Sequence, residues 1–412
     1  MFTIKDKKLK KLDQSIGEFY KLNARYFNSL INKFGRKVFK KEVKQLNSFA
    51  DSIKPTAEFD QLILQNIKSN LRIQETVIDY FTDPKFHLTP PKFIDAIAGQ
   101  GSWMMLEKRF INSPWEMRWH HTEQSLERGQ LLANEKTDEA QKLAKKIIPQ
   151  IKKDILSYGI DKGYLPANFD FQLYLLPPKD GGQYSRWNSK TKVFELGNYG
   201  FDFFHIGKSI TVMPTIAYRT SFHEIIGHAA HQSNSVDMPF SVSFSEEIAS
   251  LTSVKTTVEG ISDHASKQSW DYIQQNLSRL KIHQEEYNFQ FNLEEILAAN
   301  QYEYLFLSLV KDRETREKGF KGYKYIQQIT KNPMLARYFK HDFDSEFYDE
   351  WGSFGHTFGP DHFALMVNKL SRKFGRKYLE QNYNRFNRAH LTGVWSWEVY
   401  PDAVIWMMEN LP

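Results

Sequence analysis

The segment His223–His228 places two histidines five residues apart, and this spacing constrains the backbone more than any other feature of the chain. On a regular α-helix, five steps turn a side chain roughly 140° around the axis, so the two imidazoles would point in different directions. A local π-helical turn, with hydrogen bonds between residues i and i+5, returns them to one face. Gly227 lies within the segment and tolerates unusual backbone angles. We therefore expect a helix over about Arg219–Gln232, with a bulge near Ile226–Gly227.

The residue types in this segment are those of a metal site. Glu224 directly follows the first histidine, and the flanking residues are apolar. Imidazoles and carboxylates are common zinc ligands, and a catalytic zinc keeps three protein ligands and one position for water. His223 and His228 are therefore predicted to be ligands, and Glu224 is predicted to act as the general base. We expect one Zn²⁺ per chain, although these ligand types also bind other divalent ions.

Glu259 is the preferred third ligand. Asp263 follows it by one helical turn, so both carboxylates lie on the same face of a helix. From there Asp263 would accept a hydrogen bond from a ligand imidazole and fix its tautomer. Glu246 and Glu247 are alternatives. The Ser243-x-x-Glu246 pattern is typical of a capping box at the start of a helix, which gives Glu246 a structural role.

The segment around His223–His228 resembles the extended HExxxH motif of two zinc peptidase families. In the microtubule-associated tyrosine carboxypeptidase family, the third ligand lies in a Thr-x-Glu-Gly stretch about thirty residues downstream, similar to Thr257–Gly260. The dipeptidyl peptidase III family has a longer gap and a Glu-Glu-x-x-Ala motif, whereas Glu246–Ala249 is one residue short. The resemblance covers about forty residues. It implies a zinc metallopeptidase, an exopeptidase of carboxypeptidase type in the first case and of dipeptidyl-peptidase or aminopeptidase type in the second.

A second class of function is a catalytically silent zinc-binding interaction module. A structural zinc site usually has four protein ligands and needs no general base. His231 or His264 would be available as the fourth ligand. Retention of Glu224 beside His223 favours an enzyme.

A peptidase also needs a group that stabilises the oxyanion of the tetrahedral intermediate. His356 is the first candidate and His362 the second, with Tyr378 and Tyr383 as weaker ones. The segment Trp351–His362 is rich in glycine and aromatic residues, which predicts a loop entering the site, with a turn at its Gly-Pro pair.

A carboxypeptidase needs a cation for the terminal carboxylate of its substrate, and arginine binds a carboxylate with two parallel hydrogen bonds. Arg219 lies one turn before His223, and Arg186 lies on an expected loop. Both are candidate substrate-binding residues.

Composition limits the other possibilities. The chain of 412 residues has no cysteine, which excludes disulfides and thiolate ligands, and its net charge of +6 would suit an acidic peptide or protein substrate. The lysine-rich N-terminus lacks the apolar stretch of a signal peptide, and no apolar run is long enough for a membrane span. We expect a cytoplasmic protein that binds neither membranes nor nucleic acid. The sequence does not predict its oligomeric state.

Apolar residues recur mostly at helical spacing, and this predicts a mainly α protein. Residues 1–160 are expected to form an N-terminal helical region and residues 161–412 a catalytic zinc-binding region, together in one compact body. Short strands are expected at Phe171–Leu176, Lys192–Leu196 and Ser209–Met213. This order of a small β-sheet, a metal helix and a second helix bearing glutamate agrees with the gluzincin scheme. Ile210–Met213 is predicted to be the strand that binds the substrate backbone beside an active-site cleft.

Overall fold

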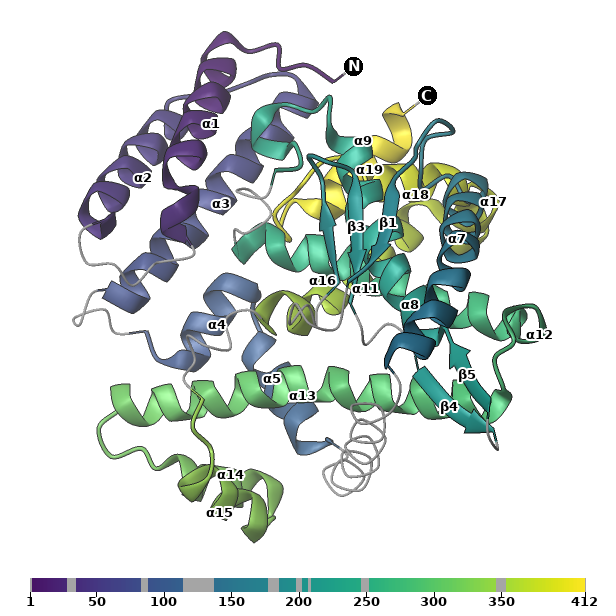
Figure 1. Ribbon diagram of the computed structural model, residues 1–412. Helices are drawn as coiled ribbons and strands as arrows, with labels where there is room; N and C mark the ends of the chain where they lie inside the picture. The colour runs from purple at the N-terminus through teal and green to yellow at the C-terminus, as the bar shows by residue number, and fades with distance from the viewer. Residues whose placement is uncertain are drawn as a thin grey trace.

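The computed structural model describes residues 2–27, 35–82, 88–113, 137–176, 185–197, 202–206, 209–245, 252–345 and 353–411. Most of these residues are helical, and short strands occupy the middle of the chain (Figure 1). The prediction of a mainly α protein with a small sheet is therefore confirmed. Within the described ranges, every helix is too short or too polar to span a bilayer.

The helices of the described residues are α1 (Lys7–Phe27), α2 (Gly35–Asp51), α3 (Glu58–Thr82), α4 (Pro90–Ala98), α5 (Ser102–Ile111), α7 (Thr137–Asp161), α8 (Thr215–Ser221), a π-helix (Phe222–Ala229), α9 (Ala230–Ser235), a 3-10 turn (Phe240–Val242), α11 (Thr252–Gln275), α12 (Leu277–Leu280), α13 (Gln284–Arg316), α14 (Gly322–Thr330), α15 (Pro333–His341), α16 (Ser353–Phe374), α17 (Arg376–Gln381), α18 (Tyr383–His390) and α19 (Tyr400–Asn410). Local sequence explains where some of them begin. Asn332, for example, accepts hydrogen bonds from the first backbone amides of α15, and a proline follows it at the first helical position.

Two hydrophobic cores hold these helices together. The first core joins residues from both ends of the chain, including Leu9 of α1 and Met407 of α19. The second core lies among α3, α4, α5, α13, α14, α15 and α16, with Phe93 and Phe306 fully buried in it. Each core takes residues from both sides of position 160. The expected division after residue 160 therefore does not separate two packing units.

The strands form two separate sheets. In the first, β1 (Gln172–Leu175) pairs in parallel with β3 (Val193–Leu196), and β3 pairs antiparallel with β2 (Arg186–Asn188). In the second, β4 (Asp202–Ile206) and β5 (Ser209–Met213) form an antiparallel hairpin. The expected strands are confirmed as β1, β3 and β5. The sequence did not predict β2 and β4, and β2 is too short for an alternating pattern to be visible.

The strand nominated for substrate binding lies in the smaller of the two sheets. The residues Ile210–Met213 belong to β5, outside the three-stranded sheet. It is β2, at one edge of that sheet, that contacts the π-helix. The sequence could not show this, because the sheet order depends on β2 passing back beside β3.

The α11 and α16 helices cross at the centre of the molecule (Figure 1). They touch backbone to backbone at Gly260 and Gly359. A Cβ atom added to Gly359 would lie 2.6 Å from the backbone nitrogen of Gly260, a distance that real side chains do not adopt. Glycine is thus required at this crossing for close approach.

The N-terminal part of α16 corrects the loop expected there. Residues 351 and 352 lie outside the described residues, and from Ser353 onward the chain is helical, with Pro360 inside the helix. The expected turn at Gly359–Pro360 is absent from this described helix. Arg109 of α5 donates to the Thr357 carbonyl at 2.8 Å and pairs with Asp361, so a tertiary contact supports the helix around the proline.

Candidate metal centre

The metal-binding helix contains the expected π-helical segment. The α8 helix, the π-helix Phe222–Ala229 and α9 follow one another without interruption. The prediction from the five-residue histidine spacing is confirmed. The role expected for Gly227 was wrong, however, because its φ angle is not positive. A Cβ there would lie 2.6 Å from the Cα of Ser262, so this glycine allows the π-helix to approach α11.

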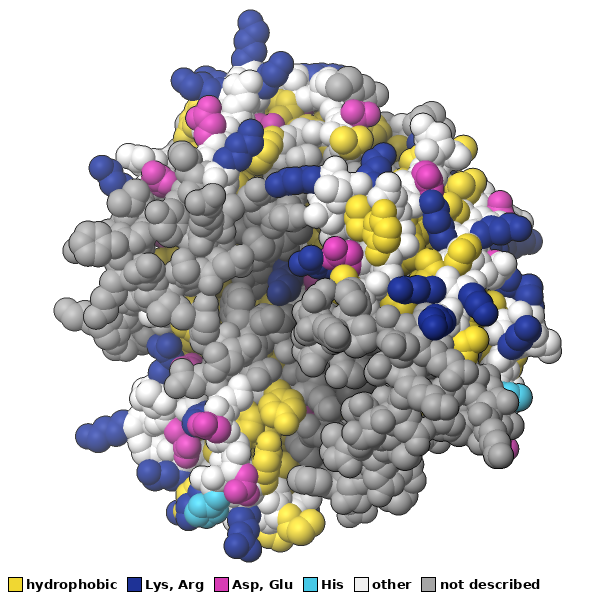
Figure 2. All heavy atoms as spheres, viewed as in Figure 1, with side chains coloured by type: hydrophobic (Ala, Val, Ile, Leu, Met, Phe, Trp, Pro, Cys, Tyr) yellow, Lys and Arg dark blue, Asp and Glu magenta, His cyan; other side chains and the backbone are white. Residues whose placement is uncertain are grey.

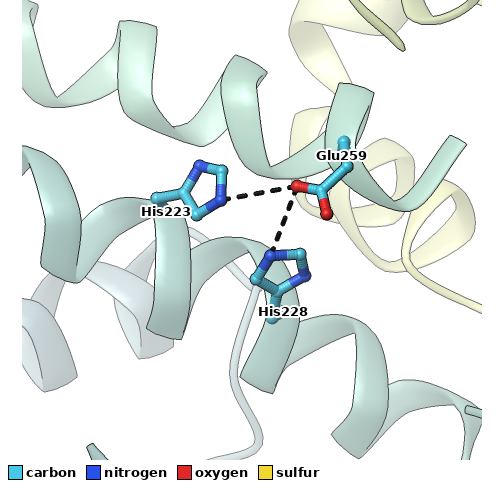
Figure 3. Close-up of side chains that lie close together, drawn as sticks. All are labelled: His223, His228 and Glu259. Atoms are coloured by element: carbon cyan, nitrogen blue, oxygen red, sulfur yellow. Dashed lines mark ion pairs between the residues drawn. The ribbon is translucent and has the colours of Figure 1, made fainter. Parts of the chain in front are cut away.

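His223 and His228 face Glu259 across the contact between the π-helix and α11 (Figure 3). Their potential ligand atoms all lie within 4.8 Å of one another. The Nε2 atoms of the two histidines are each 3.6 Å from Oε2 of Glu259, and the three side chains are only 11–17% exposed. These distances are too long for hydrogen bonds.

The spacing suits a shared ion. Two ligands of a tetrahedral zinc, with bonds of about 2.1 Å, stand roughly 3.4 Å apart. Oε2 of Glu259 is buried and has no hydrogen-bond partner among the described residues, although a buried polar atom is rarely left without one. A bound cation would satisfy this oxygen. The three side chains therefore can hold a metal ion, and their donor atoms are of the types that zinc accepts.

Two serines of α11 fix the tautomers of the histidines. The Ser262 hydroxyl donates to the Val258 carbonyl, so it accepts from Nδ1 of His228, 3.1 Å away. Similarly, the Ser266 hydroxyl donates to the Ser262 carbonyl and accepts from Nδ1 of His223 at 3.2 Å. Both imidazoles thus carry their proton on Nδ1 and present Nε2 to the centre.

Sequence reasoning did not identify these serines. They lie three and seven residues after Glu259, which places them on the same helix face. That spacing was the available signal.

Replacing Ser262 with alanine is expected to weaken zinc binding by about 10- to 100-fold, because His228 loses the partner that fixes its ring and tautomer. A competition titration against a chromophoric chelator measures the affinity. Ser269→Ala is the matched control, since Ser269 is buried on the same helix and its hydroxyl donates to the Ser266 carbonyl rather than to a histidine. Equal affinities for the two variants would contradict this role for Ser262.

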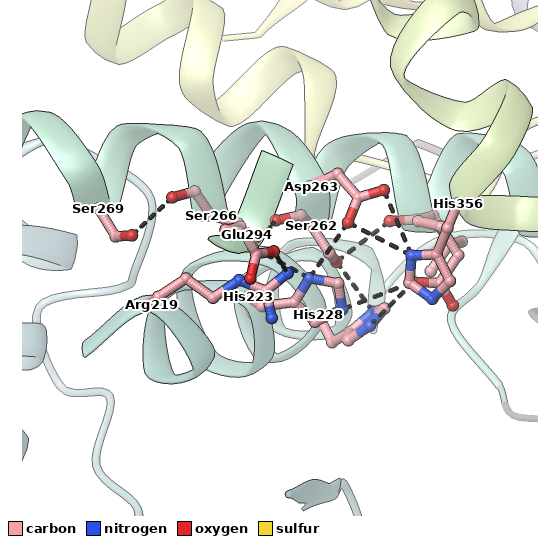
Figure 4. Close-up of polar contacts among 11 residues, drawn as sticks. Arg219, His223, His228, Ser262, Asp263, Ser266, Ser269, Glu294 and His356 are labelled. Atoms are coloured by element: carbon pink, nitrogen blue, oxygen red, sulfur yellow. Dashed lines mark hydrogen bonds and ion pairs between the residues drawn. The ribbon is translucent and has the colours of Figure 1, made fainter. Parts of the chain in front are cut away.

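His356 and Asp263 also lie at this centre (Figure 4). Nδ1 of His356 is 3.3 Å from both carboxylate oxygens of Asp263, and its Nε2 is 3.6 Å from Oε2 of Glu259. Asp263 was expected to bind a ligand imidazole, and its oxygen lies 3.5 Å from Nδ1 of His223. The shorter contact is with His356. Asp263 therefore lies between a predicted ligand and the first candidate for oxyanion stabilisation.

The charges of these groups follow from burial and from one another. Burial lowers the pKa of His228 to about 4. Burial would also lower the pKa of His356, but the hydrogen bond to Asp263 and the charge of Glu259 outweigh it and raise that pKa to about 9. Burial would raise the pKa of Glu259, but the neighbouring histidines hold it well below its usual range. Glu259 is thus an anion, as a metal ligand must be.

Glu224 lies at a cavity of about 200 Å³ beside the cluster, and burial raises the pKa of its carboxyl group. The carboxylate accepts a backbone hydrogen bond from Trp187 of β2. The Trp187 indole donates to Gln232 at 3.0 Å, which fixes β2 against α9. The cavity is lined by Trp187, Ser189, Glu224, His228, Phe244, Val258 and Glu259. In Figure 2 the molecular surface is hollowed near its centre, with Lys and Arg side chains at the hollow.

The structure does not bring His362 to the metal centre. Its ring is buried, its Nδ1 is 2.9 Å from the Thr256 hydroxyl, and its Nε2 is 2.8 Å from the Ala98 carbonyl. It also stacks on Trp397. Because both ring nitrogens are engaged, His362 is a packing residue, and its candidacy for the oxyanion was wrong.

The two candidate arginines are paired with carboxylates. Arg219 forms an ion pair with Glu294 of α13, and Arg186 forms one with Glu195 across the β2–β3 pair. Arg186 is also largely exposed. Both guanidinium groups are thus engaged in ion pairs, and their role in binding a substrate carboxylate stays a prediction.

The structure also shows the contacts of those alternative ligands that lie within the described residues. His231 bonds to the Gly393 carbonyl at 2.9 Å, and His264 stacks on Phe363. Neither joins the metal cluster, so they do not close the site. Glu246 and Glu247 lie outside the described residues.

No family model, curated protein or solved structure matches the chain. The resemblance of the HExxxH segment to zinc peptidase families therefore stays a prediction. What can be inferred about function comes from the geometry of the site.

Proposed function

We propose that the protein is a zinc-dependent metallopeptidase of gluzincin type. His223, His228 and Glu259 would hold the zinc ion. The observation that carries the proposal is the convergence of these side chains on a buried carboxylate oxygen without a partner, beside a cavity that Glu224 lines. The order of sheet, metal helix and glutamate-bearing helix along the chain also supports it.

A bound zinc would act as a Lewis acid and lower the pKa of its water ligand. Glu224 would accept the proton of that water and pass it to the leaving amine nitrogen of the substrate. His356 would donate from Nε2 to the substrate carbonyl oxygen as negative charge develops there. The Asp263 carboxylate accepts a hydrogen bond from Nδ1 of His356 and holds the ring in this orientation.

The β2 strand would bind the substrate backbone. It is an edge strand of its sheet, and Trp187 lines the cavity beside Glu224. An extended peptide adding to this edge would lie along the cavity beside the metal ligands.

We further propose an exopeptidase of carboxypeptidase type, in line with the motif resemblance. A dipeptidyl-peptidase or aminopeptidase remains the alternative from the second resemblance. A silent interaction module is favoured less, because His231 and His264 are engaged elsewhere and the cavity borders the three-ligand cluster.

The test combines metal content with hydrolysis of neutral and acidic peptides that are blocked at the N-terminus, the C-terminus or neither. We expect one zinc per chain and release of C-terminal residues that a C-terminal block prevents. Removing the metal with a chelator should abolish the activity, and added zinc should restore it.

The other outcomes separate the alternatives. Release from the N-terminus would identify the dipeptidyl-peptidase or aminopeptidase type. Bound zinc without hydrolysis of any peptide would favour the interaction module. A protein that binds no metal would contradict the whole proposal.

A further inference from the structure

We infer that Lys255 binds the C-terminal carboxylate of the peptide substrate. This inference rests on the proposed peptidase function and specifies which end of the peptide the site accepts. Lys255 lies on α11 one turn before Glu259, so the two side chains share a helix face.

The packing around Gly355 places Lys255 beside the metal centre. A Cβ added to Gly355 would lie 2.7 Å from Cγ of Glu259, 3.0 Å from Cγ of Lys255 and 3.3 Å from its Cε. The side chains of Lys255 and Glu259 therefore both pack against Gly355. The next residue is His356, and the positive charge of Lys255 acts on its ring.

Lys255 is available to a ligand. Its side chain is partly exposed, and it forms no ion pair with a carboxylate among the residues that the structure describes. The two arginines expected for this role are neutralised by Glu294 and Glu195. Among the described residues near the metal cluster, Lys255 is thus a cation without a carboxylate partner.

The position of Lys255 limits the length of peptide beyond the cleaved bond. One helical turn rises about 5.4 Å, and an extended peptide advances about 3.4 Å per residue. A carboxylate bound by Lys255 would therefore lie only a few residues beyond the scissile carbonyl. The site would remove a short C-terminal fragment rather than cut within a chain.

Lysine can supply this recognition without a fixed fork geometry, because its ammonium is a compact charge with three donors. A charge-assisted hydrogen bond in a partly desolvated site contributes enough to discriminate a carboxylate from an amide by about tenfold or more. An amidated C-terminus keeps the shape of the peptide and removes the charge. Comparing the binding of the free acid with that of the amide therefore isolates the contribution of Lys255.

The experiment measures binding without turnover. The zinc-loaded Glu224→Gln protein is titrated with an N-dansylated tetrapeptide ending in leucine, as the free acid and as the amide. We expect the acid to bind at least about tenfold more tightly. Adding Lys255→Met should remove this preference and leave amide binding unchanged, whereas Lys255→Arg should retain most of it.

Lys267→Met is the matched control, because Lys267 is an exposed lysine on the same helix. Zinc content is measured for every variant, so loss of metal is distinguished from loss of the cation. Equal binding of acid and amide to the parent protein would overturn the inference. Equal weakening of both peptides by Lys255→Met, or no binding of either to the zinc-loaded parent, would also overturn it.

Hydrolysis by the wild-type protein is scored separately. A Lys255-dependent preference for the acid without any hydrolysis would contradict the proposed peptidase function and leave carboxylate recognition intact. Hydrolysis without a preference for the acid would support the peptidase function and contradict the role of Lys255. The two conclusions therefore fail independently.

Discussion

Replacing Glu224 with glutamine is expected to reduce peptide hydrolysis by about 10²- to 10⁴-fold, the usual contribution of a general base. Glutamine has nearly the same shape, and its carbonyl oxygen can still accept the backbone hydrogen bond from Trp187. It cannot take a proton from water. The measurement is kcat/KM on peptides with a free C-terminus, together with zinc content, which should remain at one per chain.

Glu58→Gln provides the control, because Glu58 is exposed in the first turn of α3. It should retain full activity. If Glu224→Gln kept wild-type activity, Glu224 would not be the base. If the variant lost its zinc, its effect would come from a disturbed ligand set instead.

Acid is expected to destabilise the fold strongly through buried and partly buried histidines outside the ligand set. Burial lowers the pKa of His231, His264 and His362 to about 4 in each case, and it lowers the pKa of His390 well below its usual range. In the unfolded chain their pKa returns to roughly 6.5, so between these values the unfolded state binds more protons. Stability is therefore complete above about pH 6.5 and is lost as the pH falls toward 4.

The effect is large relative to the stability of a typical protein. Each shift corresponds to roughly 3 kcal/mol of unfolding free energy at the acid end of this range. Three such groups together approach the whole stability of an ordinary domain, about 5–15 kcal/mol. Urea unfolding of the chelator-treated protein, at a series of pH values between about 7.5 and 4.5, measures the loss.

His231→Gln tests the assignment, because a glutamine amide can still donate to the Gly393 carbonyl that His231 contacts. This variant should lose only part of the acid sensitivity, because His228, His264, His362 and His390 also have lowered pKa values. His341→Gln, at an exposed position of α15, should lose none. Identical pH dependence in both variants would show that His231 does not titrate on unfolding.

Most of what the sequence could predict about the site came from the number of residues between neighbouring polar side chains. The interval between His223 and His228 required a π-helical turn, and Glu259 lies close to both histidines on α11. Both inferences depend only on the number of residues per helical turn. The same is true of Asp263, although its closest imidazole proved to be His356.

Contacts between distant parts of the chain could not be predicted in this way. The partner of Arg219 lies 75 residues away on α13, and nothing in the local pattern connects the two. His362 looked available because it stands in a histidine- and glycine-rich segment, but its partners come from α4 and α11. The proline in α16 suggested a turn, and a contact from α5 supports a helix there instead.

The glycine crossing of α11 and α16 has a consequence for finding distant relatives. Gly260 directly follows the ligand Glu259, and Gly359 lies three residues after His356. A side chain at either glycine would collide with the backbone of the other helix, so neither can be replaced alone without moving part of the site. A search for homologues should therefore require Glu-Gly and His-x-x-Gly together with HExxxH. This combined pattern encodes a backbone contact as well as the metal chemistry, and so it would reject chance matches to the histidine motif alone.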